Sequence, residues 1–274
     1  MKKCIFLLAL AACLMLTIFQ SCKKRETDTH GPGKPTPPYE LVRAIHWDNG
    51  AEESMIYNTD SSLKQIDARF RTTMSNTIFE WEDGKIKKVY QNYSLYKDTY
   101  YYENGRISYY TIGSDLVPSS TYKMVFSYKS NGLPDKQQYY TINEAGTKLN
   151  TETTYEYNAA GELFQAVTTT GNSIFTHTVD QYTDSVNFNP LFFIQVGLFE
   201  NYAIFNLPVM STMKKYPAKI VRTVKTGNAA PQIDKISENT CEISNKRINK
   251  ITLKTSILGT TPSSNTVTGV FEYH

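Results

Sequence analysis

Apolar and polar positions form a loosely repeated unit over much of the chain. Each copy has an aromatic, alternating stretch, a polar turn containing Gly or Asn, and a second stretch that opens on an aliphatic residue. The copies span residues 79–86, 100–107, 126–133 and 155–163, with weaker ones at 56–63 and 243–248. Asn-Gly and Asp-Gly accept the positive φ of tight hairpin turns, and aromatic residues favour strands. The pattern therefore predicts a series of β-hairpins.

Alternation within these stretches predicts which residues share a sheet face. Ile107, Tyr109 and Thr111 are expected on one face, as are the alternate residues of 253–257 and of 267–273. Successive hairpins make an antiparallel meander, whose open edges would invite aggregation. We therefore expect an all-β fold, a strongly curled sheet or open barrel, over residues 39–274.

One apolar segment departs from the β pattern. Leu191, Ile194, Leu198 and Tyr202 are spaced as on a helix, after Asn189 as a candidate N-cap and Pro190 in the first turn. We predict a short helix over 190–203. It either plugs the curled sheet or contacts a membrane or partner. It is too short, and with Gln195 and Glu200 too polar, to span a membrane.

The first 21 residues have the form of a secretory signal. Lys2 and Lys3 precede an apolar stretch over 5–19, which is shorter than the ~20 residues of a membrane-spanning helix. Cleavage before Cys22 makes that cysteine the lipidation site. Cleavage before Cys13 would leave an apolar tail over 14–19. Secretion through an ordinary signal peptidase is the alternative.

Residues 22–38 then form a flexible tether, rich in proline towards its end. The chain has 29 Lys and Arg against 26 Asp and Glu; removing Lys2 and Lys3 leaves 27 − 26 = +1. This balance gives no reason to expect nucleic acid. With Cys22 acylated, Cys241 is the mature chain's remaining cysteine, so we expect no intrachain disulfide.

Signatures of catalysis and metal binding are missing from the sequence. His30, His46, His177 and His274 are scattered singly, whereas a metal site needs three or four convergent ligands. Glu80 and Glu82 are better explained as solvated hairpin residues than as a glycosidase pair. We predict no catalytic residues, no metal and no cofactor.

Tyrosines are the most informative excess in the composition. Eight lie between residues 90 and 110, and exposed aromatic rings can hold sugars or peptides by their flat apolar faces. The alternative is that they simply fill a broad sheet face. The candidate ligand-binding residues are Tyr93, Tyr100, Tyr102 and Tyr109.

The hairpin unit resembles a degenerate YD-type repeat. The sequence Phe19-Gln20-Ser21-Cys22 resembles the relaxed lipobox of Bacteroidota lipoproteins. Together with Asp184, the Asn189-Pro190-Leu191 segment and the terminal strand ending at Tyr273, the layout is similar to the uncharacterised DUF4595 group of Bacteroidota lipoproteins. This resemblance implies a porin-like β fold and diacylglycerol and acyl (palmitate) chains on Cys22. It implies no known activity.

Three functions remain open at the level of sequence. The leading hypothesis is a non-enzymatic outer-membrane lipoprotein, facing the periplasm or the cell surface, that binds a glycan or peptide. The second is a structural or assembly subunit that docks a partner envelope protein. The third is an unrecognised hydrolase.

Overall fold

The computed structural model describes residues 41–274, apart from 93, 115–116, 188, 196–202 and 260. The chain divides into two compact units, Met1–Thr36 and Pro37–His274, and every described residue belongs to the second. The predicted signal peptide and the whole tether, with Cys22, lie outside the described residues.

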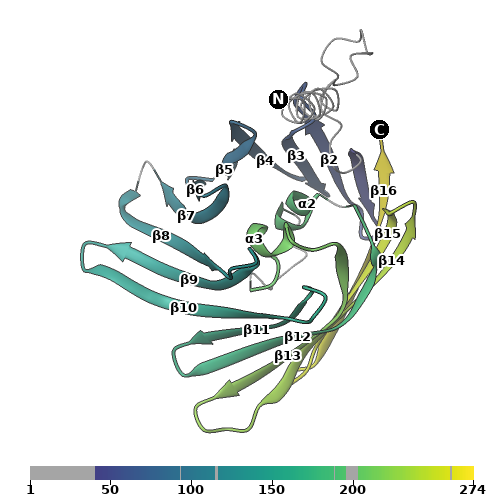
Figure 1. Ribbon diagram of the computed structural model, residues 1–274. Coiled ribbons are helices and arrows are strands. Elements are labelled where there is room, and N and C mark those ends of the chain that lie inside the picture. Colours follow the sequence, from purple (N-terminus) through teal and green to yellow (C-terminus); the bar gives the residue numbers. More distant parts are fainter. Residues whose placement is uncertain (1–40, 93, 115–116, 188, 196–202, 260) are drawn as a thin grey trace, which may run out of the picture. The chain divides into compact units, whose positions relative to one another are not determined.

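The described residues form an antiparallel barrel in which each strand pairs with the next and β16 pairs with β1 (Figure 1). The all-β prediction is confirmed, and the sheet closes. The strands are β1 Val42–Trp47, β2 Ala51–Tyr57, β3 Leu63–Phe70, β4 Thr73–Glu82, β5 Lys85–Gln91, β6 Lys97–Glu103, β7 Arg106–Ser114, β8 Val117–Tyr128, β9 Pro134–Asn143, β10 Gly146–Tyr157, β11 Leu163–Thr170, β12 Ser173–Ser185, β13 Lys215–Thr226, β14 Gln232–Ser244, β15 Arg247–Ile257 and β16 Ser263–Tyr273.

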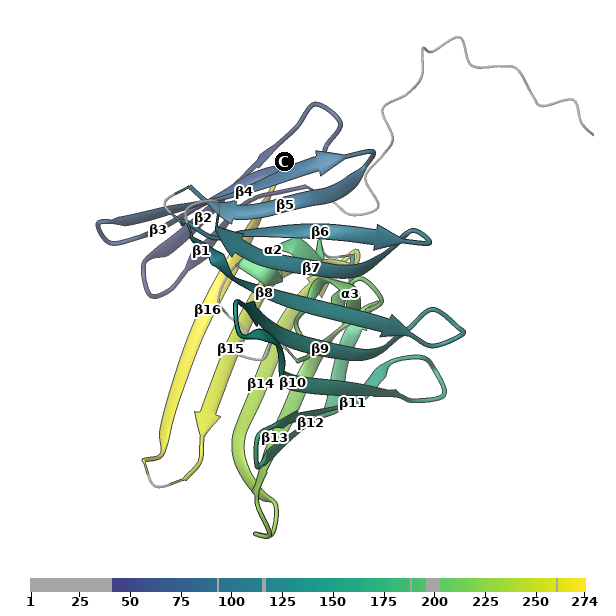
Figure 2. The same ribbon diagram turned by 90° about the vertical axis from the view of Figure 1, so that its left-hand side faces the viewer.

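Each copy of the sequence repeat is a hairpin, as predicted. Asp83–Gly84, Asn104–Gly105 and Asn245–Lys246 are two-residue turns in which both residues have positive φ. That conformation matches the right-handed twist of the flanking strands. Figure 2 shows the turns that follow β6, β8 and β10 projecting at the same end of the barrel.

A hydrogen bond from an aromatic side chain ties each of several hairpins to the one before it. Tyr102, which precedes the Asn104–Gly105 turn, donates its hydroxyl to the carbonyl of Ile86, at 2.9 Å. The corresponding pairs elsewhere are Tyr57 with Val42, Trp81 with Leu63, Tyr128 with Ile107, Tyr182 with Leu163 and Tyr273 with Ile248. In Trp81–Leu63, Tyr102–Ile86 and Tyr128–Ile107, the repeated aromatic and aliphatic positions of the sequence are therefore bonded partners from adjacent hairpins.

The two faces of the wall differ in polarity. Inward side chains such as Leu63, Ile66 and Ile251 are fully buried and form one core. Outward positions on β14 and β15 carry exposed ion pairs, Lys254 with Glu238 and Lys250 with Glu242. The barrel is thus apolar inside and charged outside over these strands.

Two short helices, α2 (Pro190–Gln195) and α3 (Leu207–Met210), lie inside the ring of strands (Figure 1). Asn189 caps α2, since its side-chain oxygen accepts a hydrogen bond from Leu191 N at 3.0 Å. Leu191 and Phe192 are each 2% exposed. A plug is therefore the role that the structure gives the described part of this segment.

The predicted helix over 190–203 differs in extent from the one observed. It is described from Pro190 to Gln195, residues 196–202 lie outside the described part, and Ala203 stands in a turn. The chain then forms α3, which the sequence analysis missed. Asn206 caps it and donates its side-chain amide to Gln137 Oε1 at 2.9 Å and to the Tyr155 hydroxyl at 3.0 Å. These bonds connect the plug to β9 and β10.

Candidate functional site

The barrel wall is held by few ladder pairs between β5 and β6. These strands pair at Lys88–Thr99, Val89–Asp98 and Tyr90–Lys97, and the ladder between them ends there. Towards the turns, the two strands diverge, over residues 85–87 of β5 and 100–103 of β6. A register shift in the β4–β5 pair and another in the β6–β7 pair lie beside this separation. Such bulges bend a strand and increase its twist. The same shift recurs in the β2–β3, β8–β9, β10–β11 and β14–β15 hairpins, so it is a feature of the repeat.

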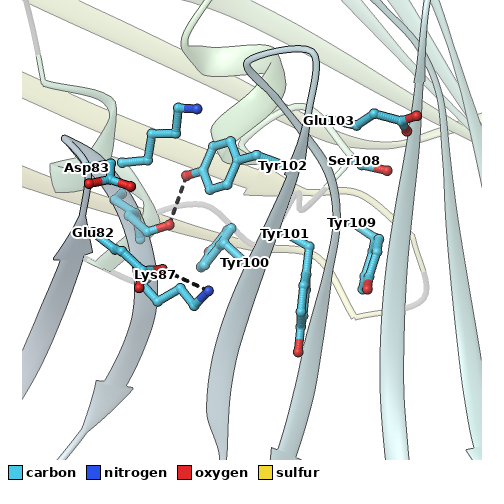
Figure 3. A pocket seen from close by; sticks show the side chains of 11 residues that line it. Glu82, Asp83, Lys87, Tyr100, Tyr101, Tyr102, Glu103, Ser108 and Tyr109 are labelled. Carbon is cyan, nitrogen blue, oxygen red and sulfur yellow. Dashed lines mark hydrogen bonds and ion pairs between the residues drawn. The ribbon is translucent and has the colours of Figure 1, made fainter.

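The divergence opens a cleft of about 510 Å³, within the range of small-molecule sites (Figure 3). We call it the β5–β6 cleft. Its lining is Glu82 and Asp83 from the end of β4 and the following turn, Lys85, Ile86 and Lys87 from β5, Tyr100, Tyr101, Tyr102 and Glu103 from β6, and Ser108 and Tyr109 from β7.

A stacked pair of tyrosines stands on the outer side of the cleft. The rings of Tyr101 and Tyr109 lie 4.4 Å apart at 15° and run side by side in Figure 3. Tyr101 is 38% exposed. The Lys123 ammonium lies 4.0 Å from the Tyr109 centroid, so one end of the stack is covered. The Lys87 ammonium is 5.9 Å from the Tyr101 centroid, so that ring is covered more loosely.

Charges of both signs border this aromatic pair. Lys87 Nζ lies 2.9 Å from Glu82 Oε2 (Figure 3), and its hydrogen bond to that carboxylate raises the pKa of Lys87. Because both side chains are solvent-exposed, the ion pair is weak and easily displaced. The cleft therefore offers one flat apolar surface with movable polar groups opposite.

The inner side of the cleft is closed by two other tyrosines. Tyr100 is 3% exposed and stacks on Tyr110 with centroids 5.0 Å apart. Tyr102 is partly buried and bridges the gap between the strands through its bond to Ile86, and burial raises the pKa of Tyr102 to about 12.

The four tyrosines chosen from the sequence do not form one surface. Tyr100 faces the core, Tyr102 spans the wall, Tyr109 faces outward, and Tyr93 lies outside the described residues. Tyr101 was missed. Strict alternation from Tyr109 to Ile107 predicts one shared face for that pair, but Ile107 is buried. Its β6 partner is Tyr102, whereas the partner of Tyr109 is Tyr101, so Ser108 is an extra residue in β7.

Two other kinds of functional feature are missing from the part of the chain that the structure describes. Among the described residues, no group of three or more His, Cys, Asp or Glu side chains is placed to hold a metal ion. Within the same part of the chain, none of the helices is long and apolar enough to cross a membrane.

Comparison with known proteins identifies the fold. The structure is similar to that of a porin-like protein from Bacteroides uniformis, with a TM-score of 0.54 and 13% identity over 88% of this chain and 98% of that one. A porin-like protein from Bacteroides vulgatus gives a TM-score of 0.44 and 13% identity over 86% and 99% of the two chains. No family model and no curated protein matches the sequence. The porin-like fold implied by the resemblance is thus confirmed, and membership of the DUF4595 group stays a prediction.

Proposed function

We propose that the protein is a lipid-anchored cell-envelope protein whose barrel binds a glycan in the β5–β6 cleft. The observation that carries the proposal is the loosely covered face of Tyr101, held in place by Tyr109 behind it. A fixed ring presents a flat apolar face without further loss of side-chain entropy, which suits the apolar face of a sugar. Lys87 and Glu82 supply donors and acceptors for its hydroxyls.

The envelope assignment rests on the signal pattern, on Cys22 and on the porin-like fold. The charges on the outer face of the barrel indicate how the protein is attached to the membrane. Membrane barrels carry an apolar outer band about 25 Å tall, whereas outward positions here bear ion pairs such as Lys254–Glu238 and Lys219–Asp180. We infer that the acyl chains on Cys22 hold the protein at the membrane while water surrounds the barrel.

Two alternatives receive less support. A docking subunit would need an exposed sheet edge or an exposed plug, but β1 pairs with β16, and Leu191 and Phe192 are buried. A hydrolase would need convergent acids. Glu53 and Asp98, whose pKa values burial raises to about 7, lie on β2 and β6, and neither lines the cleft. The proposal therefore assigns no reaction.

A glycan array probed with residues 26–274, which contain every strand of the barrel, tests the proposal. Because an aromatic stacking contact contributes about 0.5–1.5 kcal/mol beyond the area that it buries, and Tyr101→Ala also removes that area, we expect the variant to weaken a glycan hit by roughly tenfold. Tyr96→Ala, at an exposed tyrosine outside the cleft lining, is the matched control and should leave binding unchanged. Absence of any glycan hit, or a hit that Tyr101→Ala leaves intact, would refute the proposal. If a peptide binds and Tyr101→Ala abolishes that binding, the cleft is still the binding site, but its ligand is a peptide.

A further inference from the structure

A second cavity lies between the hairpin turns and the plug, and we call it the turn pocket. It has a volume of about 410 Å³ and shares Lys85, Ile86 and Tyr102 with the β5–β6 cleft. Its apolar lining includes Trp81, Tyr102, Tyr128, Ile107, Leu191 and Leu207. Ile107, Leu191 and Leu207 are buried, whereas Lys85 and Arg106 are exposed. The pocket is thus apolar at its base with a basic rim.

The two cations at the rim lack carboxylate partners within the described part of the chain. Lys85 Nζ lies 5.4 Å from the Tyr102 centroid, and the Arg106 guanidinium lies 5.4 Å from that of Tyr128. Gly132, with φ +90°, makes room for Arg106, because a Cβ there would be 2.6 Å from its Nη2. Each cation is therefore held against an aromatic ring that lines the pocket.

We propose that the turn pocket binds a carboxylate carried on an apolar chain, as in a fatty acid. The apolar base takes the chain, and the two cations at the rim are donors that suit the carboxylate. This site is separate from the glycan cleft, since Tyr102 and its bond to Ile86 stand between them. Neither proposal depends on the other.

Titration calorimetry with dodecanoate, kept below its micelle concentration, tests the inference on residues 26–274. We expect saturable binding at one site. Dodecanol and dodecyltrimethylammonium should each bind about tenfold or more weakly, because one lacks the charge and the other reverses it. Equal binding of the three probes, or binding of dodecanoate only above its micelle concentration, would overturn the proposal.

Replacing both rim cations, in the double variant Lys85→Gln and Arg106→Gln, is the decisive test. Both side chains are exposed, so the plug and the core keep their packing, and the glutamines keep hydrogen-bond donors without the charge. We expect the double variant to weaken dodecanoate binding by about tenfold or more, and Arg106→Gln alone to weaken it about threefold. Arg43→Gln, an exposed arginine on β1 outside the pocket lining, is the matched control.

The two binding proposals fail separately. Tyr101→Ala should leave dodecanoate binding unchanged, and Arg106→Gln, outside the lining of the β5–β6 cleft, should leave glycan binding unchanged. Unaltered dodecanoate affinity in the Lys85→Gln and Arg106→Gln double variant would refute the turn pocket whatever the glycan array shows.

Discussion

The hydroxyl of Tyr102 donates a 2.9 Å hydrogen bond to the backbone carbonyl of Ile86, across the part of the wall where β5 and β6 have stopped pairing. The β1–β2 pair, with the bond from Tyr57 to Val42, has an equally short ladder, whereas at the other hairpins of the series the same type of bond supplements a longer ladder. Between β5 and β6 the bond separates the β5–β6 cleft from the turn pocket. The bond therefore has a larger structural part here than where the ladder is longer.

Replacing Tyr102 by Phe removes this bond while keeping the ring. We expect Tyr102→Phe to lower the free energy of unfolding by about 1 kcal/mol, the usual net value of one hydrogen bond, because the Ile86 carbonyl loses its donor. Urea unfolding followed by circular dichroism measures the change.

Tyr157 provides a control at the same position of the repeat. Its hydroxyl is buried and has no hydrogen-bond partner among the described residues. Tyr157→Phe should therefore leave the stability unchanged or raise it slightly. Equal losses in the Tyr102 and Tyr157 variants would mean that the hydroxyl-to-carbonyl bond does not stabilise the barrel.

Barrel closure depends on a close contact between Gly269 on β16 and Trp47 on β1, which are register partners. A Cβ on Gly269 would lie 2.7 Å from Trp47 Cζ3. We expect Gly269→Ala to destabilise the protein by about 1–3 kcal/mol through overpacking. At Gly113, the nearest atoms to an added Cβ are 3.7 Å away, on Thr121. Gly113→Ala should therefore be tolerated, and comparable melting temperatures for the two variants would disprove the contact's role.

The hairpins were predictable because their information is local. Asn104–Gly105 and Asp83–Gly84 specify turns, and the flanking aromatic residues specify strands. The tyrosine site was less predictable because one extra residue, Ser108, reverses the face of everything after it. Alternation placed Tyr109 with Ile107, and the bulge places it with Tyr101. The residue types at positions 106–111 do not indicate that bulge.

Closure and the plug were harder still to predict from the sequence. The β1–β16 pair joins Arg43 to Glu272, which are 229 residues apart, and no local pattern encodes such a contact. The cap at Asn189 was predicted correctly from the Asn-Pro sequence. The cap at Asn206 was not recognised, because Leu207 separates it from Pro208 and α3 is too short to show periodicity.

The lipid anchor leads to a direct prediction. If Cys22 carries the acyl chains, Cys22→Ala should abolish metabolic labelling with a palmitate analogue and release the protein from the membrane fraction. Cys13→Ala, which alters the rejected cleavage position, should leave both labelling and membrane association intact. Labelling that persists in the Cys22 variant would disprove the assignment.

Stability should also depend on pH through Glu53, an inward-facing acid on β2 that is 7% exposed. Desolvation raises its pKa from the ordinary 4.5 to about 7 in the folded protein. The folded state thus holds this proton more tightly than the unfolded chain does. The contribution of Glu53 to the free energy of unfolding is full below pH 4.5 and is lost as the pH rises through 7.

Glu53→Gln keeps the shape of the side chain and removes its titration. We expect the variant to match the wild type in stability near pH 4 and to be more stable at pH 8 by roughly 3 kcal/mol, the value of a shift of this size. Urea unfolding at several pH values gives both profiles. Glu238→Gln is the control, because Glu238 is exposed and its hydrogen bond to Lys254 lowers the pKa of its carboxyl group, so it should bring no gain at pH 8. Parallel profiles for the Glu53 variant and the wild type would show that Glu53 ionises as readily in the barrel as in the unfolded chain.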